Sequence, residues 1–138
     1  MIKKIVFIII FSTLISCEDN TRINDCFAGI SVSEVLNTRL PSYQNLTING
    51  TSNTYAINGR SIHIIRNSAS NFVAFDLECP ERTCKTPLDI SNLPTITCTC
   101  HNKNYNYLEG GRLIGEEGCS MLMYSVSLIG NDAIQIRN

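Results

Sequence analysis

Apolar and polar residues alternate in short runs along most of this chain. One such run, Asn53 to Ile57, ends at Asn58-Gly59, a dipeptide typical of a tight hairpin turn. The run that follows, Ser61 to Arg66, places Ile62 and Ile64 on one face. No stretch holds apolar residues at helical spacing for long enough to predict an α-helix. The pattern therefore predicts an all-β chain of short strands joined by polar turns.

The alternation continues to the end of the sequence. Further strands are predicted at Phe72 to Leu77, Thr95 to Cys98, Leu122 to Leu128 and Ala133 to Arg137. One helical turn is expected at Pro41 to Leu46, because proline suits the first turn of a helix. His63 lies in the middle of a strand, and we expect it to be half-exposed rather than a ligand. Short strands at this spacing predict a small barrel or sandwich.

The first residues have the pattern of an export signal. Lys3 and Lys4 precede an apolar run, Ile5 to Ile15, which is too short to span a bilayer as a helix. The run ends in Leu14-Ile15-Ser16-Cys17, which resembles a bacterial lipobox. This resemblance implies cleavage before Cys17 and acylation of its thiol and its new amine. We therefore expect a lipoprotein signal peptide at residues 1–16, a tether at 17–25 and one folded domain at 26–138.

Such a chain would be a lipid-anchored protein of the bacterial cell envelope, periplasmic or surface-facing, with the membrane as a partner through Cys17. Export would place the domain in an oxidising compartment, where cysteines are expected as disulfides or metal ligands. The formal net charge is −1, and no run of like charges occurs in either half of the chain. The sequence therefore offers no basic field for nucleic acid.

Four of the seven cysteines fall in two short motifs. The first is Cys79-Pro80-Glu81-Arg82-Thr83-Cys84, or C-x-E-x-x-C, and the second is Cys98-Thr99-Cys100-His101, or C-x-C-H. Together they resemble the two loops of a Rieske iron–sulfur domain of the cytochrome bc type, which read C-x-H-x-x-C and C-x-C-H. The tail resembles the same family, with an aromatic residue, Tyr105, four positions after the histidine, then a glycine turn and two closing strands. The resemblance extends from about Phe72 to the C-terminus.

The resemblance implies a small, all-β, Rieske-like barrel or sandwich with a two-loop cluster-binding subdomain. It also implies a [2Fe-2S] cluster, in which one iron takes two thiolates and the other takes two imidazoles. The residues that it assigns are Cys79 and Cys98 for the inner iron, His101 for the outer iron, and Cys84 and Cys100 for a disulfide between the loops. Tyr105 matches the family tyrosine whose hydroxyl donates to a cysteine sulfur, a contact that tunes the redox potential.

The departures from the family pattern all fall at the site. Glu81 stands where the family has its other histidine ligand, and a carboxylate binds iron as a harder, anionic donor. Asn102 replaces a glycine, which is tolerable because asparagine enters left-handed conformations more easily than most residues. Lys103 replaces a serine that donates to the cluster, and Glu116-Glu117 stands in place of a proline-containing shielding loop. These changes also suit a fold that has shed its cofactor.

Several fates of the cysteines stay open at this stage. Without iron, Cys79 and Cys98 would be available to pair with each other as a second bridge between the loops. A zinc site is another alternative, because zinc-type ligands are found at Cys79, Cys84, Cys98, Cys100 and His101. However, C-x-C-H spacing is poor for a structural zinc site, and the compartment opposes free thiolates. Cys26 and Cys119 are left either to pair or to remain free.

Two functions follow from these readings. The first is a lipid-anchored electron carrier that passes single electrons to a redox partner or a quinone, with His101 as the exposed ligand. The second is a cluster-less, disulfide-stapled binding or structural module on the same fold. Neither is an enzyme by itself, and at most the chain is a redox carrier. A hydrolase has little support, because the sequence has no serine-histidine-aspartate arrangement, no H-E-x-x-H motif and no phosphate-binding glycine loop.

Overall fold

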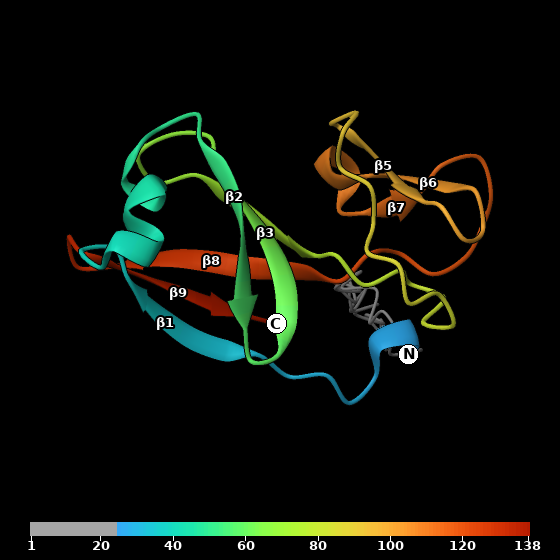
Figure 1. Cartoon of the computed structure of the whole chain (residues 1–138), viewed down its shortest axis with the longest axis horizontal. Helices are drawn as coiled ribbons and strands as arrows, with labels where there is room; N and C mark the ends of the chain where they lie inside the picture. Colours follow the sequence, from blue (N-terminus) through green and yellow to red (C-terminus); the bar gives the residue numbers. More distant parts are fainter. Residues whose placement is uncertain (1–24) are drawn as a thin grey trace, which may run out of the picture.

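A computed structural model describes residues 25–138, so the predicted signal peptide and Cys17 lie outside the described part of the chain. Strands and turns dominate this part (Figure 1). In chain order the elements are η1 (Asp25–Phe27), β1 (Ser33–Asn37), η2 (Pro41–Thr47), β2 (Ser52–Ile57), β3 (Arg60–Arg66), β4 (Phe72–Asp76), β5 (Thr95–Cys98), β6 (Lys103–Asn106), η3 (Tyr107–Glu109), β7 (Arg112–Leu113), β8 (Met123–Ile129) and β9 (Ala133–Arg137). Within residues 25–138, no helix has the length and apolar character needed to cross a membrane.

Six strands form one antiparallel sheet in the order β1-β9-β8-β4-β3-β2, which curls into a half-barrel (Figure 1). The predicted hairpin joins β2 to β3, and its turn residues Asn58 and Gly59 have φ angles of 50° and 74°. Two successive residues with positive φ make a turn whose twist matches that of the flanking strands. The turn fixes the register of β2 on β3, which pairs Tyr55 with Ile62.

One face of this large sheet carries the main core. The buried side chains there include Ile62 and Ile64 of β3, Ala74 of β4, Tyr124 of β8, Ile134 and Ile136 of β9, and Leu46 of η2. Burial of each large aliphatic side chain contributes about 1.5–3 kcal/mol. The alternation seen in the sequence is therefore an alternation between this core and the opposite face of the sheet.

The opposite face of β3 and β4 is buried as well, by a small subdomain (residues 79–121). This subdomain contains the antiparallel sheet β5-β6-β7 and lies to the right of the large sheet in Figure 1. Ile65 and Phe75 of the large sheet share a second core with Ile96, Tyr105 and Met121 of the small subdomain. β3 and β4 consequently have apolar partners on both faces.

The prediction of a half-exposed His63 is wrong, because the side chain is 5% exposed. His63 shares a strand face with Ile65, and its ring lies 5.4 Å from that of Phe75. The small subdomain covers this face, which alternation within one strand could not reveal. Burial lowers the pKa of His63, since desolvation disfavours the charged imidazolium.

The predicted fold class and strands agree with the structure. The all-β class is confirmed, and each predicted strand is found within one residue of its expected bounds. The helical turn expected from Pro41 is η2. The short strands β1, β6 and β7 were not predicted; in β1 the adjacent residues Val35 and Leu36 obscure the alternation.

Candidate functional site

Two loops meet at the small subdomain. Site loop 1 (residues 79–84) follows β4, and site loop 2 (residues 98–102) joins β5 to β6. In site loop 1 the amide of Arg82 donates to the carbonyl oxygen of Cys79 at 2.8 Å and closes a tight turn. Asn102 ends site loop 2 with a φ of 52°, so the expected left-handed backbone is found where the family has glycine. The two turns direct both motifs toward each other.

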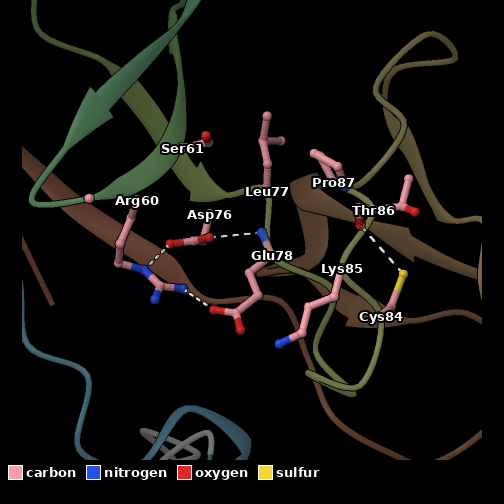
Figure 2. Close-up of a pocket in the computed structure, with 10 residues that line it drawn as sticks. Arg60, Ser61, Asp76, Leu77, Glu78, Cys84, Lys85, Thr86 and Pro87 are labelled. Atoms are coloured by element: carbon pink, nitrogen blue, oxygen red, sulfur yellow. Dashed lines mark hydrogen bonds and ion pairs between the residues drawn. The ribbon is translucent and has the colours of Figure 1, made fainter.

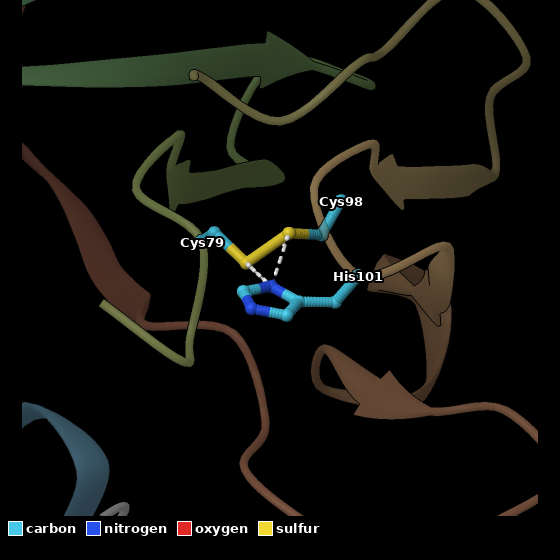
Figure 3. A group of neighbouring side chains, drawn as sticks. All are labelled: Cys79, Cys98 and His101. Carbon is cyan, nitrogen blue, oxygen red and sulfur yellow. Dashed lines mark hydrogen bonds between the residues drawn. A yellow bond between two sulfur atoms is a disulfide. The ribbon is translucent and has the colours of Figure 1, made fainter. Parts of the chain in front are cut away.

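Two disulfides connect the loops. Cys84 bonds to Cys100, which is the staple that the family resemblance implies. Cys79 bonds to Cys98 (Figure 3). These two cysteines are 0% and 1% exposed, so their disulfide lies inside the protein. The two sulfurs that the resemblance assigns to iron are thus joined to each other, which was the alternative left open by the sequence.

His101 lies over the buried disulfide. Its Nδ1 is 3.6 Å from Sγ of Cys98 and 3.9 Å from Sγ of Cys79 (Figure 3). The three potential ligand atoms all lie within 4.8 Å of one another. The side chain of His101 is 30% exposed, so the ring covers the sulfurs while keeping contact with solvent.

Glu81 points to the other nitrogen of the same ring. One of its carboxylate oxygens lies 3.1 Å from Nε2 of His101, and the other forms an ion pair with Nζ of Lys103. Nζ of Lys103 is also 3.8 Å from a carboxylate oxygen of Glu116. The hydrogen bond from Lys103 lowers the pKa of Glu81, and the same bond raises the pKa of Lys103. Both groups are therefore held in their charged forms.

This arrangement does not fit a [2Fe-2S] cluster. Such a cluster needs two separate thiolates and two further donors on the second iron. Here the thiols of Cys79 and Cys98 are used in a disulfide. The convergent donor group found in residues 25–138 contains these cysteines and His101 but does not include Glu81. The carboxylate that replaces the missing histidine binds a lysine instead of joining the donor set.

Tyr105, in contrast, retains a feature that suits a cluster-binding site. The residue is 0% exposed, and its hydroxyl has no hydrogen-bond partner within the described part of the chain. Burial raises the pKa of this hydroxyl, so it is a protonated donor at neutral pH. Buried hydroxyls ordinarily have a partner. A sulfur acceptor at the site would give Tyr105 the role that the resemblance assigns to it.

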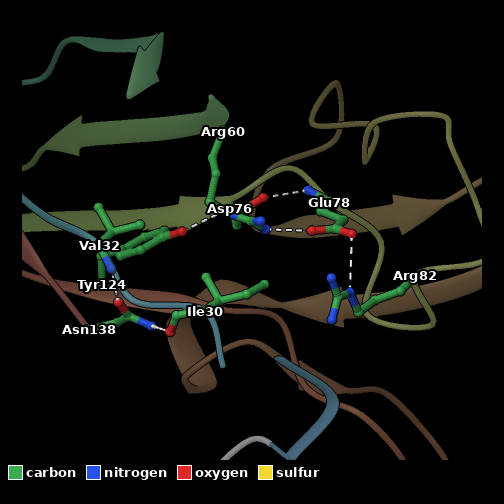
Figure 4. Close-up of polar contacts among 8 residues, drawn as sticks. All are labelled: Ile30, Val32, Arg60, Asp76, Glu78, Arg82, Tyr124 and Asn138. Atoms are coloured by element: carbon green, nitrogen blue, oxygen red, sulfur yellow. Dashed lines mark hydrogen bonds and ion pairs between the residues drawn. The ribbon is translucent and has the colours of Figure 1, made fainter. Parts of the chain in front are cut away.

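A buried polar network ties site loop 1 to the large sheet (Figure 4). Asp76, which is 1% exposed, accepts hydrogen bonds from Nε of Arg60 at 2.5 Å and from Oη of Tyr124 at 2.6 Å. Arg60 also donates to Glu78 at 2.5 Å, directly before the loop. Burial and the bond to Asp76 raise the pKa of Tyr124, which therefore acts as a donor.

This network was not predicted from the sequence. The available signal was Asp76 at the end of an otherwise apolar strand, followed two residues later by a second carboxylate. A buried carboxylate needs a cationic partner. Identifying that partner as Arg60, sixteen positions earlier, required the pairing of β3 with β4.

A pocket of about 210 Å³ lies beside the network (Figure 2). Arg60, Asp76 and Glu78 line it, but they are already paired with one another. Lys85 is a further charged residue of the lining. The volume is below the roughly 300–1,000 Å³ usual for small-molecule sites. The pocket is therefore a weaker candidate for function than the two site loops.

The third disulfide settles the question that the sequence left open for Cys26 and Cys119. These residues are bonded to each other across a sequence separation of 93. Cys119 belongs to the segment between β7 and β8, which also carries Glu116. The bond attaches the start of the described chain to the small subdomain.

The predicted site residues are therefore found together, with the exception of Cys17, which lies outside the described residues. The residues gathered at the two loops are Cys79, Glu81, Cys84, Cys98, Cys100, His101 and Tyr105. Their proximity was expected from the motifs. The sequence had left open a disulfide between Cys79 and Cys98, and the structure contains it. The ion pair of Glu81 with Lys103 was not predicted.

Comparisons with known proteins agree with this architecture. A family model described as the Rieske [2Fe-2S] domain matches residues 38–123, which is more than half of the chain. The match begins well before Phe72, so it includes β2 and β3 as well. Among curated proteins, none matches this chain.

A similar solved structure is provisionally described as the small subunit of an NADPH nitrite reductase, an oxidoreductase. It is 12% identical to this chain, with a TM-score of 0.43. The aligned region covers 77% of this chain and 97% of that one.

Proposed function

Because this chain belongs to the Rieske [2Fe-2S] domain family, we propose that it is an envelope lipoprotein that uses the family fold without its cluster. The family fold is that of iron–sulfur, electron-transfer domains. In this chain the two site loops are held by protein groups alone. The domain then acts as a binding or structural module at the membrane surface and not as an electron carrier.

The observation that carries this proposal is the ion pair between Glu81 and Lys103. Both residues stand at positions where the family has other residues, histidine and serine. Each departure taken alone would leave a charged group without its nearest ionic partner. Together they form a tie between site loop 1 and the start of β6, at the place where the family uses a metal-bound histidine.

The disulfide between Cys79 and Cys98 supports the same proposal. Two buried free thiols have no stable fate in an oxidising compartment unless they bind a metal or each other. The bond leaves neither sulfur as a thiolate ligand. It also closes the loops with a covalent bridge where a cluster would otherwise join them.

The lipid anchor is part of this proposal. It rests on the basic and apolar leader that ends in Leu14-Ile15-Ser16-Cys17. Three disulfides among the described residues agree with export to an oxidising compartment. More than one acyl chain gives stable membrane attachment without a spanning helix.

A lipid-anchored electron carrier, with a redox partner or a quinone, is the second candidate. It is favoured by the hydroxyl of Tyr105, which has no hydrogen-bond partner among residues 25–138, and by the convergence of Cys79, Cys98 and His101. It would require the disulfide between Cys79 and Cys98 to be absent in the working protein. The two candidates therefore differ in the state of these two sulfurs.

The deciding experiment measures iron and thiols in the same sample. The full chain is exported with iron available, purified from membranes, and reduced with dithionite for electron paramagnetic resonance. A separate portion is alkylated before any reduction and analysed by peptide mass spectrometry. We expect no iron, no rhombic signal, and no alkylation of Cys79 or Cys98. Two irons per chain with a rhombic Rieske-type signal would establish the electron carrier instead.

A matched variant shows which residues exclude the metal. Glu81→His with Lys103→Ser restores both family residues and removes the ion pair without altering a cysteine. Iron uptake by this double variant, and not by the wild type, would show that Glu81 and Lys103 prevent iron binding. If the double variant also stays free of iron, the disulfide between Cys79 and Cys98 prevents iron binding as well.

A further inference from the structure

The start of the described chain is fixed at the small subdomain. Cys26 lies in η1 and is bonded to Cys119, in the segment that closes the small subdomain. Phe27, the next residue, is 3% exposed and belongs to the main core. In Figure 1 the described N-terminal end lies beside the small subdomain, whereas the turn between β8 and β9 lies at the opposite end of the molecule.

The chain that follows Cys26 is held as well. The side chain of Asn138 accepts a hydrogen bond from the amide of Val32 at 2.7 Å and donates to the carbonyl oxygen of Ile30 at 2.9 Å (Figure 4). The entry of the chain into the domain is thus fixed by a disulfide, a buried aromatic ring and a pair of hydrogen bonds. The point of entry cannot move without breaking these contacts.

The distance from this point to the proposed anchor is short. Cys17 and Cys26 are nine positions apart in the sequence, and even a fully extended chain over that span reaches only about 30 Å. That reach is comparable to the diameter of a small domain. Only a fully extended tether would therefore let the side that carries Cys26 point away from the lipid, and any shorter conformation of the chain keeps that side nearer to the lipid than the opposite side.

The surface near this point has no net positive charge, because residues 79–121 contain four lysines and arginines against five aspartates and glutamates. Ile114 is 48% exposed and lies on the same segment as Cys119. The charged groups of the adjoining site are paired, as in Lys103 with Glu81 and Glu116. A net attraction to anionic headgroups is thus not expected, and the covalent tether sets the orientation.

We propose that the Cys26–Cys119 disulfide orients the domain on the bilayer, with the small subdomain and its site loops toward the lipid and the β8–β9 turn away from it. This inference rests on the lipidation of Cys17 in the proposed function. Its consequence is that a partner of the site loops meets them at the membrane surface.

Energy transfer to the membrane tests this orientation. In the mature chain the lysines are Lys85 and Lys103, both in the small subdomain, and the acylated N-terminus has no free amine. The full lipoprotein with Lys103→Arg is labelled with an amine-reactive donor dye at Lys85 and placed in phosphatidylcholine vesicles that contain an acceptor lipid. A second variant, Lys85→Arg, Lys103→Arg and Asn131→Lys, carries the dye at the β8–β9 turn.

We expect a higher transfer efficiency from position 85 than from position 131. Equal efficiencies, or the reverse order, would overturn the orientation. In a Cys26→Ser, Cys119→Ser background the difference between the two dyes should shrink, and an unchanged difference would show that the disulfide does not set the orientation. If that background does not fold, the comparison between the two dyes still decides the proposal.

The lipid anchor is checked on the same samples by intact mass. Absence of the acyl mass on Cys17 would overturn the anchor, and the orientation with it. An acylated chain with equal transfer from both dyes would overturn the orientation alone. The two failures are therefore distinguishable.

Discussion

Glu81 and Lys103 face each other across the two site loops, and their ion pair leaves the second carboxylate oxygen of Glu81 against His101. The pair connects site loop 1 directly to β6. It lies at the surface of the buried Cys79–Cys98 disulfide, which His101 covers. A covalent bond below and an ionic contact above therefore hold the same two loops.

Replacing Glu81 with glutamine should lower the free energy of unfolding at neutral pH, and this loss should vanish in acid. The folded protein lowers the pKa of Glu81, so the stability from its charged form is present above the ordinary carboxyl pKa and is lost as pH falls through the lowered value. The measurement is urea unfolding of both proteins from about pH 3 to about pH 8, a range that spans carboxyl titration. A difference between them that does not change with pH would contradict an ionic role for Glu81.

Loss of Arg60 should be far more damaging than loss of a surface arginine. Arg60→Met would leave Asp76, which is 1% exposed, without its cation, and such a loss costs about 3–5 kcal/mol of stability. The matched control is Arg39→Met, whose pair with Asp132 is solvent-exposed, and its expected cost is about 0–1 kcal/mol. Equal effects in urea unfolding would mean that Asp76 is not held by Arg60.

His63 should make the domain less stable as pH falls through the range in which histidine titrates. Its pKa is lowered in the folded state, so the unfolded chain binds the proton first and stability is lost below the ordinary histidine pKa of about 6.5. His63→Phe keeps an aromatic ring beside Phe75 and removes the titrating group. The variant should lose less stability than the wild type between about pH 7 and about pH 5, on either side of that pKa. Parallel pH profiles would rule out this role.

Gly111→Ala should be much more destabilising than Gly110→Ala. Both glycines have positive φ, 76° and 69°, so each alanine would suffer backbone strain of roughly 1–2 kcal/mol. Only at Gly111 would the new Cβ meet another residue, because it would lie 2.8 Å from Cβ of Met121. Thermal melting of the two variants isolates this steric contact. Equal melting temperatures would show that Met121 can move aside.

Two of the three disulfides should differ in the stability that they confer. The Cys26–Cys119 bond closes a loop with a sequence separation of 93, against 16 for Cys84–Cys100. In the chain-entropy description the longer loop contributes about 1.5 kcal/mol more. Urea unfolding of the Cys26→Ala, Cys119→Ala and Cys84→Ala, Cys100→Ala variants gives the comparison. A larger loss from the second pair would mean that the site loops depend on their staple beyond loop entropy.

Local signals were sufficient for most of the fold. Period-two alternation located the main strands, because each has one face toward the main core. Asn58-Gly59 predicted its hairpin, since few other dipeptides enter two left-handed conformations at low cost. These features depend on neighbouring residues and can be read from one sequence.

Contacts between distant segments could not be predicted from these local signals. The burial of His63 depends on a subdomain that begins sixteen residues after it, at Cys79. The motifs predicted that Glu81 and His101 would lie together, but not that Glu81 would pair with Lys103. Side-chain pairing at a site depends on the geometry of two loops, and spacing along the chain does not fix that geometry.

The two-sided burial of β3 and β4 has a consequence for the way in which the domain opens. Ile62 and Ile64 face one core while Ile65 and Phe75 face the other, so neither core can lose its packing without disturbing strands that both require. We therefore expect a single cooperative unfolding transition in which the two halves melt together. The slowest amide hydrogen exchange should fall on β3 and β4, at the global rate, because these strands are released only when the whole domain unfolds.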